Sequence, residues 1–189
     1  MQMEYPTATI EMDNGSKIVI LLRPDQAPNT VASFIHLASL GCFDGHAIQR
    51  IVPGYVADMS YSAFGKEQAK YLIANESRNH GVDNTLPVEP GKICMGGYSA
   101  GIAGGEFFFP YAYHEKLQGN YPAFGEVLEG WEEVERWATV ALVPVPSEYV
   151  EINRPEVPIV IRRVTVDCKG QEFPPPVKLE GAKLPSTWR

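Results

Sequence analysis

Residues 43–56 read FDGHAIQRIVPGYV, and this stretch decides the fold. Its alternating apolar residues predict two short strands, the first entered through Asp44-Gly45 and the two joined by a tight turn at Pro53-Gly54. Arg50 lies between them, and its guanidinium stays charged at any working pH and presents a rigid fork of donors. A charge held against apolar β surface is costly unless it faces an acceptor. The arginine is therefore either a rim residue that reaches water or a donor in a hydrophobic cleft that awaits a substrate carbonyl.

Further stretches favour the second interpretation. They are GSKIVILL at 15–22, PDQAPNTV at 24–31, GGEFFF at 104–109 and LQGNYPAFGEVLEG at 117–130. With the arginine segment, they occur in the order and approximate spacing of a cyclophilin. From about Ala8 to Cys168 the chain resembles the cyclophilin-type peptidyl-prolyl cis-trans isomerases, of a bacterial-like kind with a divergent active site.

That resemblance implies a mainly β fold, a closed antiparallel eight-stranded β-barrel with two capping helices. Hydrophobic periodicity agrees with it. A helix capped by Asn29 and stopped by Gly41 is expected, as are a second helix over 130–138 and a short one near 66–73, within a polar stretch at 60–91. The predicted strands are 7–12, 17–22, 47–51, 55–59, 93–95, 107–109, 123–128 and 157–168. Phe107 and Phe124 are expected in the core.

Length and composition fit one domain. At 189 residues and 44% hydrophobic content, the chain is long enough for one substantial core and short for two. We expect a cyclophilin-like domain over 1–169 and a proline-rich C-terminal tail over 170–189. The prolines of the tail favour an extended conformation, lying on the body or in solvent.

Charge and cysteine usage exclude several classes. A net charge of -7 argues against nucleic acid and against anionic membranes as partners, and no apolar run is long enough to span a bilayer. The N-terminus lacks the basic and apolar parts of a signal peptide. Cys42, Cys94 and Cys168 are best interpreted as reduced core thiols. We therefore expect a cytoplasmic monomer with no metal and no cofactor.

The implied chemistry is rotation about an X-Pro bond, whose barrier is about 18–20 kcal/mol. It needs no nucleophile or metal, only a pocket that prefers the twisted amide and a donor near the prolyl nitrogen. By resemblance, Arg50 is the catalytic donor. Tyr55, Val56, Phe108 and Leu117 would seat the proline ring, with Tyr121 closing the wall, and Met95, Gly96 and Gly97 would lie along the substrate backbone. The partners would be proline-containing peptides or unfolded proteins that the enzyme helps to fold.

The chain departs from the family pattern inside this site. Asp58 and Glu106 stand where cyclophilins commonly have glutamine, and Gly97 stands where they have an asparagine that bonds substrate. If the acids pair with Arg50, they partly cancel its field, which weakens catalysis and favours a cationic substrate. If they turn to solvent, Arg50 stays free. The alternative to an isomerase is a non-catalytic module that binds proline peptides on the same scaffold.

Residues 97–101 also match the G-x-S-x-G pattern of serine hydrolases. That nucleophile elbow must join a strand to a helix, with an acid and a histidine downstream. The residues after it cannot readily start a helix, and His114 is the only downstream histidine. Ser99 is therefore expected to be a loop residue. His36, His46, His80 and His114 lack metal-ligand spacing.

Overall fold

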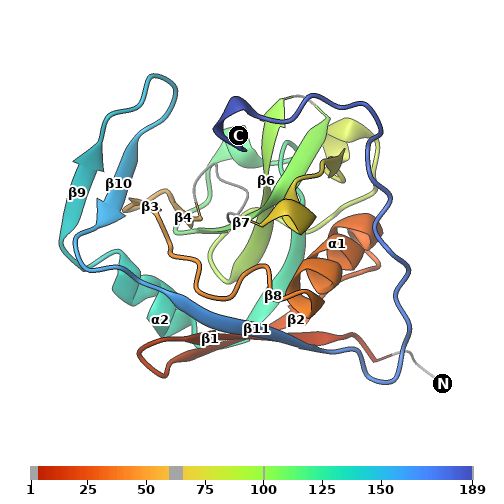
Figure 1. Ribbon diagram of the computed structural model, residues 1–189, viewed down its shortest axis with the longest axis horizontal. Coiled ribbons are helices and arrows are strands. Elements are labelled where there is room, and N and C mark those ends of the chain that lie inside the picture. Colours follow the sequence, from red (N-terminus) through yellow and green to blue (C-terminus); the bar gives the residue numbers. More distant parts are fainter. Residues whose placement is uncertain (1–3, 60–65, 100, 189) are drawn as a thin grey trace.

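The computed structural model describes residues 4–59, 66–99 and 101–188 (Figure 1). A strongly curled antiparallel sheet holds eight strands in the order β11-β1-β2-β8-β6-β7-β4-β3, with a short ninth strand on β7. The eight strands are β1 Thr7–Met12, β2 Lys17–Leu22, β3 Arg50–Val52, β4 Val56–Asp58, β6 Lys92–Ser99, β7 Ile102–Pro110, β8 Ala123–Glu129 and β11 Ile161–Asp167. The predicted eight-stranded antiparallel fold with two helices is confirmed.

The two edges of this curled sheet meet through a loop and not through a full ladder. Ala47 and Val160 form an isolated β-bridge. Around it, the Ile48 N–H donates to the Ile159 carbonyl and the Ile161 N–H to that of His46, both at 2.8 Å. The first of the two short strands therefore begins only at Arg50, later than the predicted 47–51.

Helices α1 (Pro28–Ser39) and α2 (Trp131–Trp137) pack aromatic side chains into the core. The Phe34 ring of α1 lies 5.9 Å from Phe107 and 5.4 Å from Phe124, centroid to centroid. The Trp137 ring of α2 lies 5.8 Å from Phe109. Each such buried ring contributes about 1.5–3 kcal/mol of transfer free energy as an upper estimate. The core placement predicted for Phe107 and Phe124 is confirmed.

The predicted cap of α1 is wrong. The helix begins at Pro28, which suits the first helical position because it has no N–H to satisfy. Asn29 therefore lies inside the first turn. The orphan N–H groups of Asn29 and Thr30 are satisfied by the buried carboxylate of Glu76, which also accepts from the Thr30 hydroxyl. A negative charge at a helix N-terminus is favourable, so a distant residue caps the helix.

Two further local predictions are corrected. The expected helix near 66–73 is a single 3₁₀ turn, Glu67–Ala69, followed by strand β5 (Ile73–Ala74), which pairs with β7; residues 60–65 of the predicted irregular stretch lie outside the described part. Ser99 is the last residue of β6 and not a loop residue, and the next strand starts at Ile102. The G-x-S-x-G segment thus connects two strands, whereas a hydrolase elbow requires a helix.

A hairpin missed in the sequence stands apart from the main sheet at the upper left of Figure 1. Strands β9 (Leu142–Val145) and β10 (Ile152–Pro155) pair with each other in a separate two-stranded sheet. The alternation of apolar residues on either side of Pro146-Ser147 was the available signal.

The C-terminal tail lies on the body of the molecule and runs up the right of Figure 1 and over its top. The Asn29 side chain holds the main chain of Val177 with two hydrogen bonds of 2.7 and 2.9 Å. The Leu179 N–H donates to the Leu72 carbonyl at 2.8 Å. Further on, Trp188 is buried against Leu72.

Cys42 and Cys94 are buried free thiols, as predicted, whereas Cys168 is only partly buried just past β11. None of the helices within the described ranges is both long and apolar enough to cross a membrane. The same ranges contain no group of His, Cys, Asp and Glu side chains suited to holding a metal ion.

Candidate active site

Strand register brings the polar residues of the site together. Arg50 of β3 lies directly opposite Asp58 of β4, and Asp58 lies opposite Phe108 of β7. Since side chains alternate along a strand, Val56 and Glu106 share this face. The intervening residues, such as Ala57 and Phe107, point into the core. The outer face of three adjacent strands therefore carries the site.

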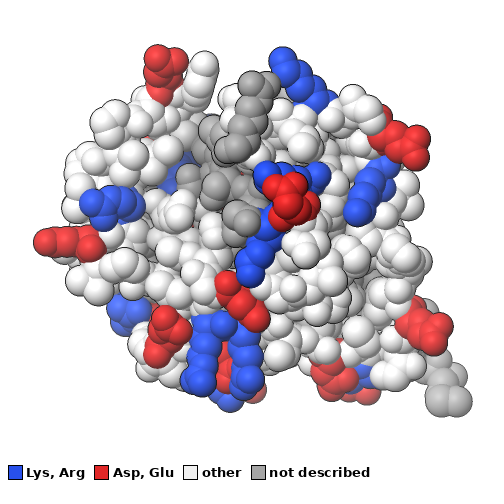
Figure 2. Space-filling model, in the orientation of Figure 1, with Lys and Arg blue, Asp and Glu red and all other residues white. Residues whose placement is uncertain are grey.

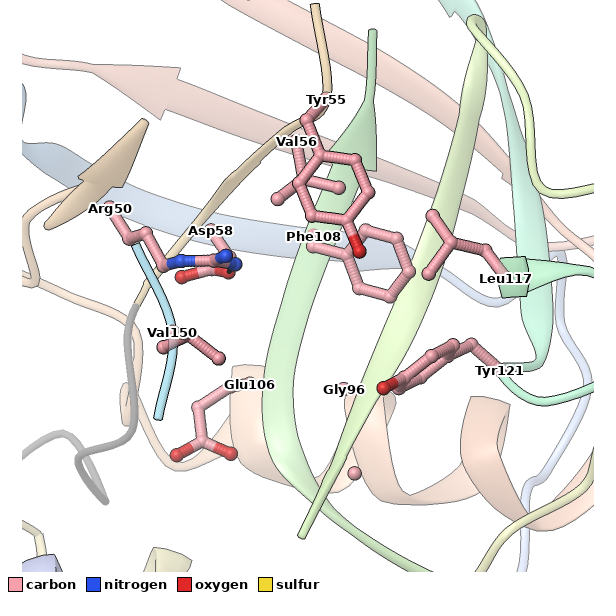
Figure 3. A pocket seen from close by; sticks show the side chains of 11 residues that line it. Arg50, Tyr55, Val56, Asp58, Gly96, Glu106, Phe108, Leu117, Tyr121 and Val150 are labelled. Atoms are coloured by element: carbon pink, nitrogen blue, oxygen red, sulfur yellow. Dashed lines mark hydrogen bonds and ion pairs between the residues drawn. The ribbon is translucent and has the colours of Figure 1, made fainter. Parts of the chain in front are cut away.

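These side chains line a hollow of about 110 Å³ (Figure 3). Its lining comprises Arg50, Tyr55, Val56, Asp58, Gly96, Gly97, Glu106, Phe108, Leu117, Tyr121 and Val150. Of the residues singled out in the sequence, only Met95 does not line it, because that residue faces the core and is fully buried. The structure thus gathers the other ten residues in one place.

The guanidinium of Arg50 is oriented by two acceptors. Nη1 donates to Asp58 Oδ2 at 2.8 Å, and Nε donates to the main-chain carbonyl of Glu151 at 2.7 Å. The Cζ atom of the guanidinium lies 5.9 Å from the centroid of the Tyr55 ring. Arg50 is only 6% exposed, and within the described residues Nη2 has no hydrogen-bond partner. The side chain is therefore fixed, with one nitrogen left to act on a ligand.

Only one of the two acids pairs with Arg50. Asp58 forms the ion pair, while Glu106 lies on the other side of Val150 in Figure 3 with its carboxyl pointing away from the guanidinium. The pairing of both acids with Arg50 considered for this chain is therefore not what the structure shows. One carboxylate and one main-chain carbonyl hold the guanidinium of Arg50. This arrangement lies between a free arginine and one locked by two carboxylates.

The opposite side of the hollow is apolar. Phe108 and Tyr121 pack edge to face with ring centroids 5.6 Å apart. Val56 and Leu117 are buried in the same small cluster. Burial raises the pKa of Tyr121, so its hydroxyl stays neutral in the physiological range. This arrangement offers a rigid seat for a small hydrophobic ring, next to a positive donor.

Close packing of the backbone explains why position 97 is a glycine and not an asparagine. A Cβ atom there would lie 2.8 Å from the Ile102 carbonyl oxygen, and one at Gly96 would lie 3.0 Å from that of Glu106. The pairing of β6 with β7 shifts register between Met95 and Gly97, which brings the two backbones close. An asparagine at 97 would therefore not fit without movement of the main chain.

Glu106 is a carboxyl in the wall of the hollow that is only 5% exposed. Its Oε1 finds no partner among the described residues, while the nearby Trp188 side chain of the tail acts to lower the pKa of the carboxyl. Burial raises its pKa well above the ordinary value, and the charge of Asp58 adds to this effect. A neutral carboxyl matches a glutamine amide in shape and in charge. The raised pKa thus favours the protonated form, which resembles the glutamine that the family pattern has at this position.

This raised pKa predicts that stability falls at higher pH. The unfolded chain releases the Glu106 proton near pH 4.5, while the folded protein keeps it to a much higher pH. The stability contributed by Glu106 is therefore complete below pH 4.5. It is lost progressively as the pH rises from there through the folded-state pKa. We expect Glu106→Gln to unfold at a higher urea concentration than wild type at alkaline pH and to flatten the decline.

The matched control is Glu133→Gln. Glu133 is also buried, but hydrogen bonds from Arg136, Trp137 and Asn14 outweigh that burial and lower its pKa. Its contribution is lost on acidification, so this variant should keep the alkaline decline. Identical urea midpoints of wild type and Glu106→Gln from pH 5 to pH 9 would contradict a raised pKa of Glu106.

Sequence reasoning missed three residues of the site. Val150 lines the hollow, Glu151 offers its main-chain carbonyl to Arg50, and Trp188 influences the pKa of Glu106. The first two belong to the hairpin loop, whose strand alternation was a usable signal. No local signal exists for Trp188, because its position depends on the path of the tail over the surface.

Comparisons with known proteins agree with this geometry. The family model described as cyclophilin type peptidyl-prolyl cis-trans isomerase/CLD matches residues 7–166. Peptidyl-prolyl cis-trans isomerase B of Bacillus subtilis is 31% identical over 122 residues, which are 64% of this chain and 82% of that protein. Peptidyl-prolyl cis-trans isomerase-like 2 of Cryptococcus neoformans is 28% identical over 164 residues, 86% of this chain but only 27% of that longer protein.

Solved structures carry the same fold. A crystal structure of a cyclophilin type peptidyl-prolyl cis-trans isomerase from Cryptosporidium parvum superposes with a TM-score of 0.67 at 19% identity, covering 86% of this chain and 98% of that one. The same protein, crystallised in the presence of the dipeptide Ala-Pro, gives a TM-score of 0.66.

Proposed function

Because the chain belongs to the family of cyclophilin-type peptidyl-prolyl cis-trans isomerases, we propose that its rotation of X-Pro bonds takes place in the hollow at Arg50. The observation that carries this proposal is the register of β3, β4 and β7. It sets a fixed guanidinium, whose Nη2 has no hydrogen-bond partner in the described part of the chain, beside the apolar seat of Phe108 and Tyr121.

The reaction follows from these contacts. The proline ring enters the apolar seat, which holds the ring while the residue before it rotates. As amide resonance is lost, the lone pair localises on the prolyl nitrogen, and a donor there stabilises the twisted state more than either planar one. Nη2 of Arg50 is that donor. The acceptors Asp58 and Glu151 hold it in place beforehand, so little reorganisation accompanies the reaction.

Members of this family bind proline peptides, and the structure crystallised in the presence of Ala-Pro belongs to a relative. For this chain we propose proline-containing segments of unfolded or exposed proteins as substrates, so that the enzyme assists folding. On the face shown in Figure 2, acidic and basic side chains are interspersed among areas without Lys, Arg, Asp or Glu. We also propose that it acts as a monomer in the cytoplasm, where free thiols such as Cys42 and Cys94 persist. The division into a domain over 1–169 and a tail over 170–189 is part of the same proposal.

The experiment is exchange spectroscopy by NMR on a short X-Pro peptide with catalytic amounts of protein. Uncatalysed isomerisation takes tens to hundreds of seconds, so cross-peaks between cis and trans signals within about one second report catalysis. We expect such cross-peaks with this protein. Peptide signals that shift on titration, without exchange, would instead indicate a proline-binding module.

Replacing Asp58 by glutamine tests how the ion pair affects the rate. The carboxylate lies 2.8 Å from Nη1 and offsets part of the field that Arg50 offers to the prolyl nitrogen. A neutral amide can still accept the hydrogen bond, so the arginine stays in place while its field increases. We expect kcat/KM to rise roughly threefold to tenfold. The same measurement on Asp58→Gln with Glu106→Gln should give little more, since Glu106 forms no ion pair with Arg50 and its raised pKa favours the protonated form. No gain in either variant would contradict a weakening of Arg50 by Asp58.

A further inference from the structure

The loop of the β9–β10 hairpin, residues 146–151, reaches the edge of the site. Val150 lines the hollow, and the neighbouring Glu151 accepts a hydrogen bond from Arg50 through its main-chain carbonyl. The hairpin belongs to a sheet of its own, so the curled main sheet does not need it for its ladders. Because the hairpin is not part of the main sheet and its loop contacts Arg50, we ask what the loop contributes to the site.

The first part of that role is to orient Arg50. Its Nε and Nη1 are held by acceptors from two different elements, the hairpin loop and β4. Asp58 alone would allow the guanidinium to turn about that single contact. The Glu151 carbonyl adds a second fixed point 2.7 Å from Nε, which decides that Nη2 is the nitrogen left for the substrate. Because the acceptor is a main-chain atom, the path of the loop matters and not the side chain at 151.

The second part concerns the residue before proline. In Figure 3 the proline seat of Phe108, Leu117 and Tyr121 lies on one side, and Val150 lies on the other, between Arg50 and Glu106. Since Nη2 must reach the bond between proline and its predecessor, that predecessor extends past Arg50, towards Val150. An apolar side chain there favours an aliphatic neighbour over glycine.

We propose that the 146–151 loop is a substrate-positioning element of this isomerase, in which the Glu151 carbonyl orients Arg50 and Val150 selects an aliphatic residue before proline. This inference rests on the proposed function of Arg50. It adds a specificity wall built from a hairpin that lies outside the main sheet.

The loop can be removed cleanly. Val145 and Ile152 are directly opposed in the ladder, so Asn-Gly in place of residues 146–151 joins them through a two-residue type I′ turn. The base of the hairpin keeps the hydrogen bond from the Glu156 N–H to the Ala141 carbonyl. This replacement removes Val150 and the Glu151 carbonyl together and leaves both strands intact.

We expect the loop replacement to lower kcat/KM about tenfold for all X-Pro peptides, because a misplaced donor loses much of its effect. The Nε–Hε NMR signal of Arg50 gives a second readout. It should be slow to exchange with water in wild type and fast in the variant, a change that a merely structural loop would not cause. A kcat/KM within about twofold of wild type, with an unchanged Arg50 signal, would overturn the inference.

Val150→Ala tests the specificity wall without altering the loop. We expect kcat/KM for a peptide with leucine before proline, divided by kcat/KM for one with glycine there, to fall about fourfold in this variant. That is the effect of about one buried CH₂. The matched control is Glu148→Ala, an exposed residue on the same loop, which should leave that ratio unchanged. An unchanged ratio in Val150→Ala overturns the selection.

Failure of the inference and failure of the proposed function are distinguishable. If Arg50→Ala is inactive while the loop replacement and Val150→Ala behave as wild type, the catalytic role of Arg50 stands and that of the loop falls. If Arg50→Ala isomerises as fast as wild type, both fall.

Discussion

Replacing Arg50 by alanine is expected to lower kcat/KM for an X-Pro peptide by about 100- to 1000-fold, the usual loss when a preorganised donor to a transition state is removed. The reason is the geometry of the side chain, which is 6% exposed and held by Asp58 and Glu151. Nothing in the reaction requires a nucleophile or a proton relay, so the donor is the main electrostatic contribution. Exchange spectroscopy on wild type and variant at equal concentrations measures it.

Arg50→Lys is the control for charge alone. A lysine keeps the positive charge but lacks the planar fork, so it cannot hold both acceptors and still direct a third N–H into the hollow. We expect it to remain closer to alanine than to wild type. Both variants also remove the ion pair between Arg50 and Asp58, so thermal unfolding must be followed in parallel. An Arg50→Ala protein that is folded and as active as wild type would refute the proposed mechanism.

Replacing Gly130 by alanine is expected to destabilise the protein by about 4 kcal/mol or more, a size seen when sterics and backbone strain act together. Gly130 joins β8 to α2 with a φ of +85°, and a Cβ there would lie 2.0 Å from the Lys17 carbonyl oxygen. That oxygen belongs to the backbone of β2, which cannot move aside without breaking its ladders. Urea unfolding of the variant, or its failure to accumulate as folded protein, measures the effect.

Gly15→Ala separates the two contributions. Gly15 has nearly the same φ, +88°, but an added Cβ would meet nothing within 4 Å. It should therefore lose only the cost of a left-handed conformation, about 1–2 kcal/mol. Equal losses at the two glycines would show that the close approach to β2 has no energetic effect.

Regular patterns made much of the fold predictable. The strands at 7–12 and 17–22 were predicted with their observed bounds, because strict alternation around a Gly-containing turn has one interpretation. The second helix was predicted to within a residue at each end. The stretch at 66–73 was not, since its apolar residues fit a helix as well as the short strand that β7 recruits.

The candidate site was predictable as a set of residues but not as a network. The resemblance to cyclophilins singled out Arg50, Asp58 and Glu106, yet it could not say which acid pairs with the arginine. Register places Asp58 opposite Arg50, whereas the Glu106 carboxyl points away from the guanidinium on the other side of Val150. Met95 was named together with Gly96 and Gly97, but only the two glycines line the hollow, because the side chain of Met95 faces the core.

By itself, the sequence determined most strands and the two helices through their periodicity, which is a local property of the chain. Its resemblance to cyclophilins, carried by short segments in register, determined the family and named most residues of the hollow. Only the tertiary structure decided how Arg50 is held, by an acid across the ladder and by a carbonyl from a hairpin about 100 residues away. The same holds for Glu76 at the start of α1 and for Trp188 on Glu106. Such contacts join segments far apart in sequence, and their energies depend on distance and burial, which exist only once the chain has folded.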